Sequence, residues 1–148
     1  MVRATLTDGR GWQRAGFRFV ERADAPYRIV VAEADETQAL CRPYDVFRTY
    51  SCQNGPAVVL HADRWRTATP KWTGDVAAYR QMLVNHEVGH LLGMRHPAVQ
   101  CPGHGQVAPV MAQQSTELDG CLPNPWPLDE EVARASRHDL PLAPPFAR

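Results

Sequence analysis

The alternation of hydrophobic and polar positions predicts short strands in the first half of the chain. Apolar and polar residues alternate over 16–21, whereas the more continuous apolar run at 27–32 is typical of a more fully buried strand. Two further β-branched and aromatic runs, at 46–50 and 57–61, flank a segment that contains the Asn54-Gly55 step. Because an Asn-Gly pair between such runs is a strong hairpin signal, we expect these two strands to pair.

The spacing changes to that of a helix after residue 73. Apolar residues recur three and four positions apart up to Leu91, with Asp75 near the start and Gly93 as a stop signal. Nine of the 13 prolines lie at or after Pro97, so residues 97–127 are expected to form an ordered loop. A last helix is expected at 128–138. Its acidic first turn (Asp129, Glu130, Glu131) and its basic last turn (Arg134, Arg137, His138) suit the helix dipole. A proline-rich surface tail is expected after it.

Length and charge narrow the class of protein. The 148 residues fit one domain, 1–148, which we expect to be a monomer. Sixteen basic and 16 acidic side chains leave no net charge, which argues against a nucleic-acid partner. No apolar run approaches the roughly 18–20 residues of a membrane span, and the first residues lack the apolar segment of a signal peptide.

The four cysteines form two local pairs, Cys41 with Cys52 and Cys101 with Cys121. None has the Cys-x-x-Cys spacing, which argues against a four-cysteine zinc site or a thioredoxin motif. Two disulfides would imply an oxidising compartment, and buried free thiols are the alternative. We therefore expect a secreted or extracytoplasmic protein whose signal or anchor lies upstream of a trimmed N-terminus.

Candidate metal chemistry lies on the predicted long helix. His86 and His90 are four residues apart, so both imidazoles leave one helix face about 6 Å apart and can bind one Zn²⁺ at about 2.0–2.1 Å. Glu87 is rotated about 100° around the helix, which suits a general base better than a ligand. Gly93 can adopt a left-handed conformation that ends the helix and returns His96 to the metal.

The motif HExxHxxGxxH, filled here at every defining position, resembles the signature of the metzincin zinc metalloproteases. That family has a Met-turn beneath its zinc-binding histidines, and Met111 in a proline-bounded loop is the candidate for it. Residues 85–90, 109–111 and 119–121 are together similar to a domain-of-unknown-function family of actinobacterial exported proteins. This resemblance covers most of residues 40–127.

The metzincin resemblance implies an α+β zincin fold with two subdomains. A small twisted mixed sheet over the active-site helix would form the upper subdomain, about 1–93. An irregular segment with a C-terminal helix would form the lower one, about 94–148. An edge strand above the cleft would bind substrate as an added antiparallel strand, with 57–61 as its inner neighbour. We expect that edge strand to comprise Val46, Phe47, Arg48, Thr49 and Tyr50; a strand with no role beyond pairing is the alternative.

The activity that the resemblance implies is that of a zinc endopeptidase acting on a peptide or protein substrate. His86, His90 and His96 would hold one catalytic Zn²⁺, and Glu87 would assist attack of the zinc-bound water on the scissile carbonyl. The alternatives are an exported cell-envelope binding module with a structural zinc site, and a zinc hydrolase of a non-peptide amide.

Three further features qualify this interpretation. His104 could serve as a fourth ligand of a structural site, although an exposed loop histidine is the simpler reading. Gln113 occupies the position where some metzincins carry a tyrosine that approaches the metal, so no side chain is assigned to stabilise the oxyanion. Of the three connectivities that four cysteines allow, the local pairing would bracket the proposed edge strand and tie down the loop of Met111.

Overall fold

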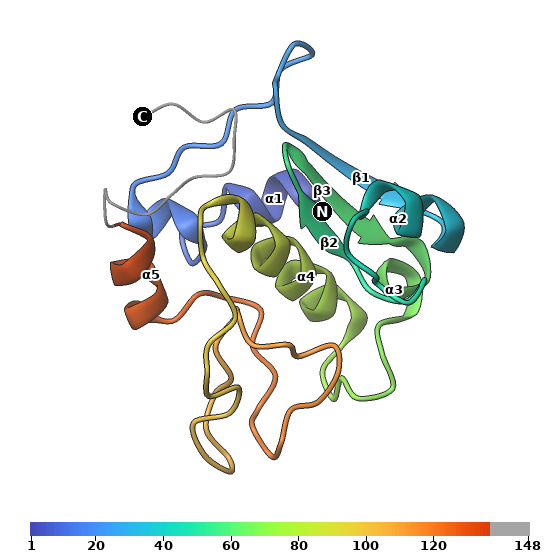
Figure 1. The fold of residues 1–148 in the computed structure, drawn as a ribbon. Coiled ribbons are helices and arrows are strands. Elements are labelled where there is room, and N and C mark those ends of the chain that lie inside the picture. Colours follow the sequence, from blue (N-terminus) through green and yellow to red (C-terminus); the bar gives the residue numbers. More distant parts are fainter. Residues whose placement is uncertain (137–148) are drawn as a thin grey trace.

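The fold of residues 1–136, the part of the chain that the computed structural model describes, is mixed α+β (Figure 1). The elements in chain order are α1 (Val2–Leu6), the 3₁₀ helix η1 (Trp12–Ala15), β1 (Arg28–Ala32), α2 (Ala34–Leu40), β2 (Cys52–Asn54), β3 (Ala57–His61), α3 (Ala62–Thr67), α4 (Val76–Leu91) and α5 (Asp129–Ala135). The expected α+β class with a small mixed sheet is therefore confirmed.

The sheet has the strand order β1-β3-β2. β3 lies in the centre, parallel to β1 and antiparallel to β2, and all five of its residues are buried. Its side chains alternate between two faces, as a pleated strand requires. Val58 and Leu60 join the core that includes α4, whereas Ala57 and Val59 pack in a second cluster with Cys41 at the end of α2.

The predicted edge strand at 46–50 is wrong. Its residues are irregular, and Phe47 and Arg48 both have φ of 53°. Asp45 Oδ1 accepts the Phe47 N–H at 2.8 Å, and the His61 ring donates from Nε2 to the Arg48 carbonyl at 2.9 Å. These local bonds bend the segment into a loop, so the Asn-Gly hairpin forms with β2, Cys52–Asn54, as the partner of β3.

The alternating segment at 16–21 is not a strand either. Phe17 and Phe19 pack against the main core, but Val20 is 72% exposed and no neighbouring strand pairs with the segment. Alternation alone could not reveal this missing partner. The short helices α2 and α3, of seven and six residues, were not predicted, because each contains too few turns to show a helical repeat.

Helix α4 confirms the long predicted helix and forms the centre of the molecule (Figure 1). Asp75 caps its N-terminus by accepting the Ala78 N–H at 2.6 Å. Ten of its 16 residues are buried, because α4 is enclosed by the sheet, by α1 and by the segment that follows α1. Trp12 is fully buried against it and donates its indole N–H to the Asn85 carbonyl at 2.9 Å.

The lower half confirms an ordered loop over 97–127, with one isolated bridge between Val107 and Leu122. The expected last helix is α5, Asp129–Ala135, with Leu128 and Ser136 as its caps. Arg137, His138 and the proline-rich tail lie outside the described residues. Both expected disulfides, Cys41–Cys52 and Cys101–Cys121, are present. No helix within residues 1–136 is long and apolar enough to cross a membrane.

Candidate metal centre

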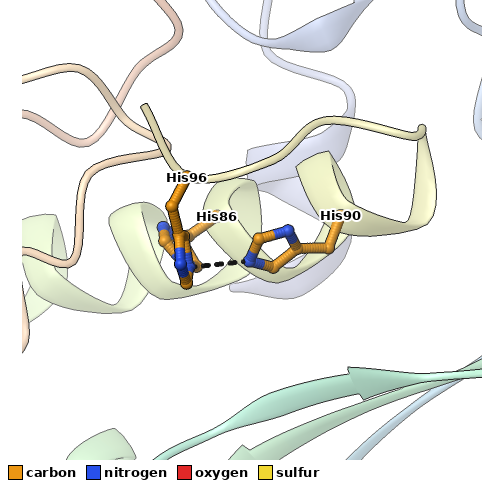
Figure 2. A group of neighbouring side chains, drawn as sticks. All are labelled: His86, His90 and His96. Atoms are coloured by element: carbon orange, nitrogen blue, oxygen red, sulfur yellow. Dashed lines mark hydrogen bonds between the residues drawn. The ribbon is translucent and has the colours of Figure 1, made fainter. Parts of the chain in front are cut away.

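The three histidines of the motif converge on one point (Figure 2). The Nε2 atom of His96 lies 3.2 Å from Nε2 of His86 and 3.1 Å from Nε2 of His90. A tetrahedral ion with metal–nitrogen bonds of about 2.0–2.1 Å separates its ligand nitrogens by about 3.3–3.4 Å. The two distances from His96 therefore suit one small metal ion, and the ligand atoms of all three histidines lie within 4.8 Å of one another.

Backbone carbonyls fix the tautomers of two of these rings. His86 donates from Nδ1 to the Val110 carbonyl at 2.8 Å, and His90 donates from Nδ1 to the Met94 carbonyl at 2.9 Å. A neutral imidazole with its proton on Nδ1 presents a lone pair at Nε2. Burial lowers the pKa of His86 to about 3 and also lowers the pKa of His90, so both rings are neutral near pH 7.

Gly93 brings His96 back to the helix, as predicted. Gly93 follows the C-cap residue Leu92 and has a φ of 90°, and its N–H donates to the His90 carbonyl at 3.0 Å. The Met94 N–H bonds to the Gly89 carbonyl at 2.9 Å. This pair of bonds is the Schellman motif, which ends a helix and reverses the chain at a left-handed glycine.

Met111 lies in a tight turn directly against α4. The Ala112 N–H bonds to the Pro109 carbonyl at 3.0 Å and closes the turn. Met111 is 1% exposed, and a Cβ built on Gly89 would lie 2.3 Å from its sulfur. The absence of a side chain at Gly89 thus lets the methionine approach the helix one residue before His90. Met111 thus packs on the histidine-bearing helix, and its assignment as the Met-turn residue stays a prediction.

Glu131 on α5 holds this turn in place, a role that no sequence pattern indicated. Its two carboxylate oxygens accept the N–H groups of Val110 at 3.0 Å and Met111 at 2.9 Å, and Oε2 also accepts the Leu128 N–H. Since the Val110 carbonyl bonds to His86, Glu131 helps to fix the position of His86 through the turn. From the sequence, Glu131 is one of three acidic residues in the first turn of α5, and this position predicted only a favourable interaction with the helix dipole.

Glu87 is beside the histidines and outside their ligand set. Its side chain is 5% exposed, and burial raises the pKa of its carboxyl to about 8. Within residues 1–136 no other histidine, cysteine, aspartate or glutamate joins His86, His90 and His96 as a fourth ligand. His104 packs instead against Gly120 in the loop closed by Cys101–Cys121. A fourth coordination position is therefore open on the protein side.

The histidines and Glu87 line a cleft of about 430 Å³. Its walls come from the loop at 44–50, the start of β2, the first half of α4 and the segment 113–116 after the Met111 turn. Val46, Phe47 and Tyr50 reach the cleft even though 46–50 is no strand, whereas Arg48 pairs with Asp35. Arg64 of α3 also lines the cleft, although no motif predicted it.

The two disulfides suggest an oxidising, extracytoplasmic environment for the protein. Among the described residues no free cysteine remains, so the alternative of buried free thiols is excluded for this structure.

The sequence matches a protein family over almost its whole length. No curated protein and no solved structure matches it. The family model covers residues 1–135, which include all three histidines, Glu87, Met111 and Glu131. The chain belongs to the family described as Protein of unknown function (DUF3152).

Proposed function

We propose that this protein is a zinc-dependent endopeptidase. The observation that carries the proposal is the convergence of three Nε2 atoms, two of them with fixed tautomers, beside the buried carboxyl of Glu87 in an open cleft. Three imidazoles suit zinc, and catalytic zinc sites commonly combine three protein ligands with one open position. The resemblance to metzincins, through Gly93, His96 and Met111, supports the same assignment.

The metal would act as a Lewis acid on a water molecule and on the scissile carbonyl. Its holders would be His86, His90 and His96, whose orientation the carbonyls of Val110 and Met94 maintain. Buried neutral rings require little reorganisation before they donate their lone pairs to a cation.

Glu87 is the proton carrier in this proposal. Because Glu87 follows His86 on α4 and lines the same cleft as the three histidines, the proposal places the attacking water within reach of its carboxylate. A carboxylate oxygen of Glu87 takes the proton of the attacking water and then delivers it to the leaving amine nitrogen. The burial that raises its pKa makes it a stronger base than an exposed glutamate.

A closed structural zinc site is less well supported. Such sites have four protein ligands, whereas the described residues provide three, and the candidate fourth ligand His104 packs elsewhere. A structural site also has no use for a buried carboxyl group beside the ligands. Hydrolysis of a non-peptide amide would use the same groups, so substrate profiling must decide between these two activities.

The test is a peptide-library digest read by mass spectrometry. Wild-type protein is assayed as purified, after removal of metal by a chelator, and after addition of one equivalent of Zn²⁺. We expect cleavage of internal peptide bonds that is lost with the metal and restored by zinc. Full cleavage by metal-free protein, or no cleavage by protein that holds one zinc per chain, would overturn the proposal.

A further inference from the structure

Arg64 places a positive charge in the wall of the cleft. It is half-buried on α3, and it lines the same cleft as His86 and Glu87. Its guanidinium donates from Nε to the Thr49 carbonyl at 3.3 Å and from Nη1 to the Ala68 carbonyl at 3.3 Å. These bonds hold the group between the loop at 44–50 and the end of α3.

No carboxylate within residues 1–136 forms an ion pair with Arg64. The nearby arginines Arg48 and Arg66 are paired with Asp35 and with Glu33 and Asp63 respectively. A half-buried charge that meets only carbonyl dipoles retains a strong preference for an anionic partner.

The other charged groups of the cleft do not neutralise it. Asp45 is exposed and uses Oδ1 to accept the Phe47 N–H, while Glu87 lies beside the histidines. Arg95 is exposed and adds a second positive charge to the lining. Arg64 is therefore a cationic group of the cleft wall that has no ion-pair partner within residues 1–136.

The geometry of the guanidinium fits a carboxylate. The group has five N–H donors, of which the two bonds to Thr49 and Ala68 use two, one at Nε and one at Nη1. Three donors remain at the end formed by Nη1 and Nη2. That end can bind both oxygens of one carboxylate, the arrangement in which arginine is strongest and most selective.

The surroundings of Arg64 favour a carboxylate on an apolar stem. The apolar residues Met82 and Leu83 of α4 line the same cleft, and the hydroxyl of Tyr79 is hydrogen-bonded with Ser115 Oγ at 2.8 Å. Tyr79 lies seven residues before His86, about 10 Å along the helix axis. A substrate held near the histidines therefore occupies the same cleft that Arg64 lines.

We infer that Arg64 is a specificity-determining residue that makes the cleft selective for a peptide substrate with a carboxylate near the scissile bond. This inference rests on the proposed peptidase function. The carboxylate could belong to an aspartate or glutamate side chain or to the C-terminus of the substrate, and the two sources share the same chemistry at Arg64.

Matched peptides and matched variants test this role. Two peptides that differ only by Glu or Gln at one position of a cleaved sequence measure charge recognition, because the two side chains are nearly isosteric. Each peptide is made with a free and with an amidated C-terminus to separate the two sources of the carboxylate. The variants are Arg64→Gln, Arg64→Lys and the control Arg80→Gln.

Arg80 is a close control because it is also half-buried and also donates to backbone carbonyls, those of Trp65 and Arg66, but it does not line the cleft. If Arg64 were only a structural tie, Arg64→Gln would slow both peptides equally. Charge recognition predicts instead a change in the ratio of their kcat/KM values, with Arg64→Lys retaining part of it.

We expect wild-type protein to prefer the carboxylate-bearing peptide over its amide counterpart by about tenfold or more. Arg64→Gln should reduce this ratio to below about twofold, and Arg80→Gln should leave it unchanged. An equal rate for both peptides with wild-type protein would overturn the inference, as would a ratio that survives in Arg64→Gln.

Binding separates this inference from the proposed function. Calorimetry with zinc-loaded Glu87→Gln protein should show tighter binding of the carboxylate-bearing peptide, and Arg64→Gln in that background should remove the difference. If wild-type protein cleaves no peptide, the endopeptidase proposal fails, and the binding ratio still decides whether Arg64 recognises a carboxylate. Cleavage without a binding or rate preference overturns the role of Arg64 alone.

Discussion

At the scale of single residues, Glu87 is the group whose properties depend most on its surroundings. An exposed glutamate is ionised at pH 7, whereas burial raises the pKa of Glu87 to about 8. In metal-free protein, Glu87 of the folded state therefore stays protonated over a pH range in which the unfolded chain, with a glutamate pKa near 4.5, has lost this proton. Metal-free protein should accordingly lose stability through Glu87 as the pH rises from about 4.5 to about 8.

This pH dependence gives a prediction for metal-free Glu87→Gln. Glutamine cannot ionise, so the variant should gain stability relative to wild type by a few kcal/mol between about pH 5 and pH 8. Denaturant unfolding of both chelator-treated proteins at the two pH values measures the difference. The exposed Glu36→Gln serves as the control and should show no such gain. A pH-independent difference between Glu87→Gln and wild type would contradict the assigned pKa.

The sequence revealed the residues of the motif because their geometry is local. His86, Glu87, His90, Gly93 and His96 lie within 11 consecutive residues, so the helical repeat and one left-handed glycine determine how they meet. Arg64 and Glu131 reach the same site from other helices, and only tertiary packing brings them there. In the sequence, nothing around Arg64 or Glu131 distinguishes these two residues from ordinary charged surface residues.

At the scale of elements, the contact between α4 and the Met111 turn determines the floor of the site. Gly89 allows this contact because an added Cβ would lie 2.3 Å from the Met111 sulfur and 2.9 Å from Cζ2 of Trp12. The methionine end could move, but the Trp12 ring is fully buried and is anchored through its bond to the Asn85 carbonyl. The close approach of α4, the Met111 turn and Trp12 thus depends on glycine at position 89, where alanine would add a methyl group.

Gly89→Ala should therefore destabilise the protein by about 1–3 kcal/mol through overpacking, and it should weaken zinc binding because the Val110 carbonyl that orients His86 moves with the turn. Denaturant unfolding and a competitive zinc titration measure the two effects. Gly9→Ala is the control, since a Cβ there meets nothing within 4 Å. If both variants behave like wild type, the close packing of Met111 on α4 is unimportant for the site.

The elements also show where sequence patterns are insufficient. The apolar and aromatic run at 46–50 has strand composition, yet bonds from Asp45 and His61 fold it into a loop, and the three residues of β2 provide the pairing instead. The run at 16–21 alternates correctly but has no neighbouring strand. Strand formation requires a partner, and the partner is a property of the whole fold.

At the scale of the whole molecule, two disulfides tie segments that contribute to the cleft. Cys41–Cys52 joins the end of α2 to the start of β2. Cys101–Cys121 closes the loop that contains the Met111 turn. The large irregular segment between α4 and α5 has little regular structure to hold it. Such a segment gains stability from a covalent link that shortens its free chain in the unfolded state.

Removing the lower disulfide should have a measurable cost. The double variant Cys101→Ser/Cys121→Ser should lower the free energy of unfolding by about 3 kcal/mol, since the link closes a loop of 20 residues. Thermal unfolding checks this value, and thiol titration of denatured wild-type protein without reductant should find no free cysteine. Four titratable thiols in protein purified from an oxidising compartment would contradict the two links and the environment inferred from them.

The central claim is that the three histidines and Glu87 form one hydrolytic centre. The most direct measurement compares the cleavage rate of one peptide by wild-type protein and by Glu87→Gln, with the zinc content of each sample determined alongside. We predict one zinc per chain in both proteins and a rate that is lower by about 10²–10⁴-fold in the variant. Equal cleavage by two samples that each hold one zinc would contradict the claim.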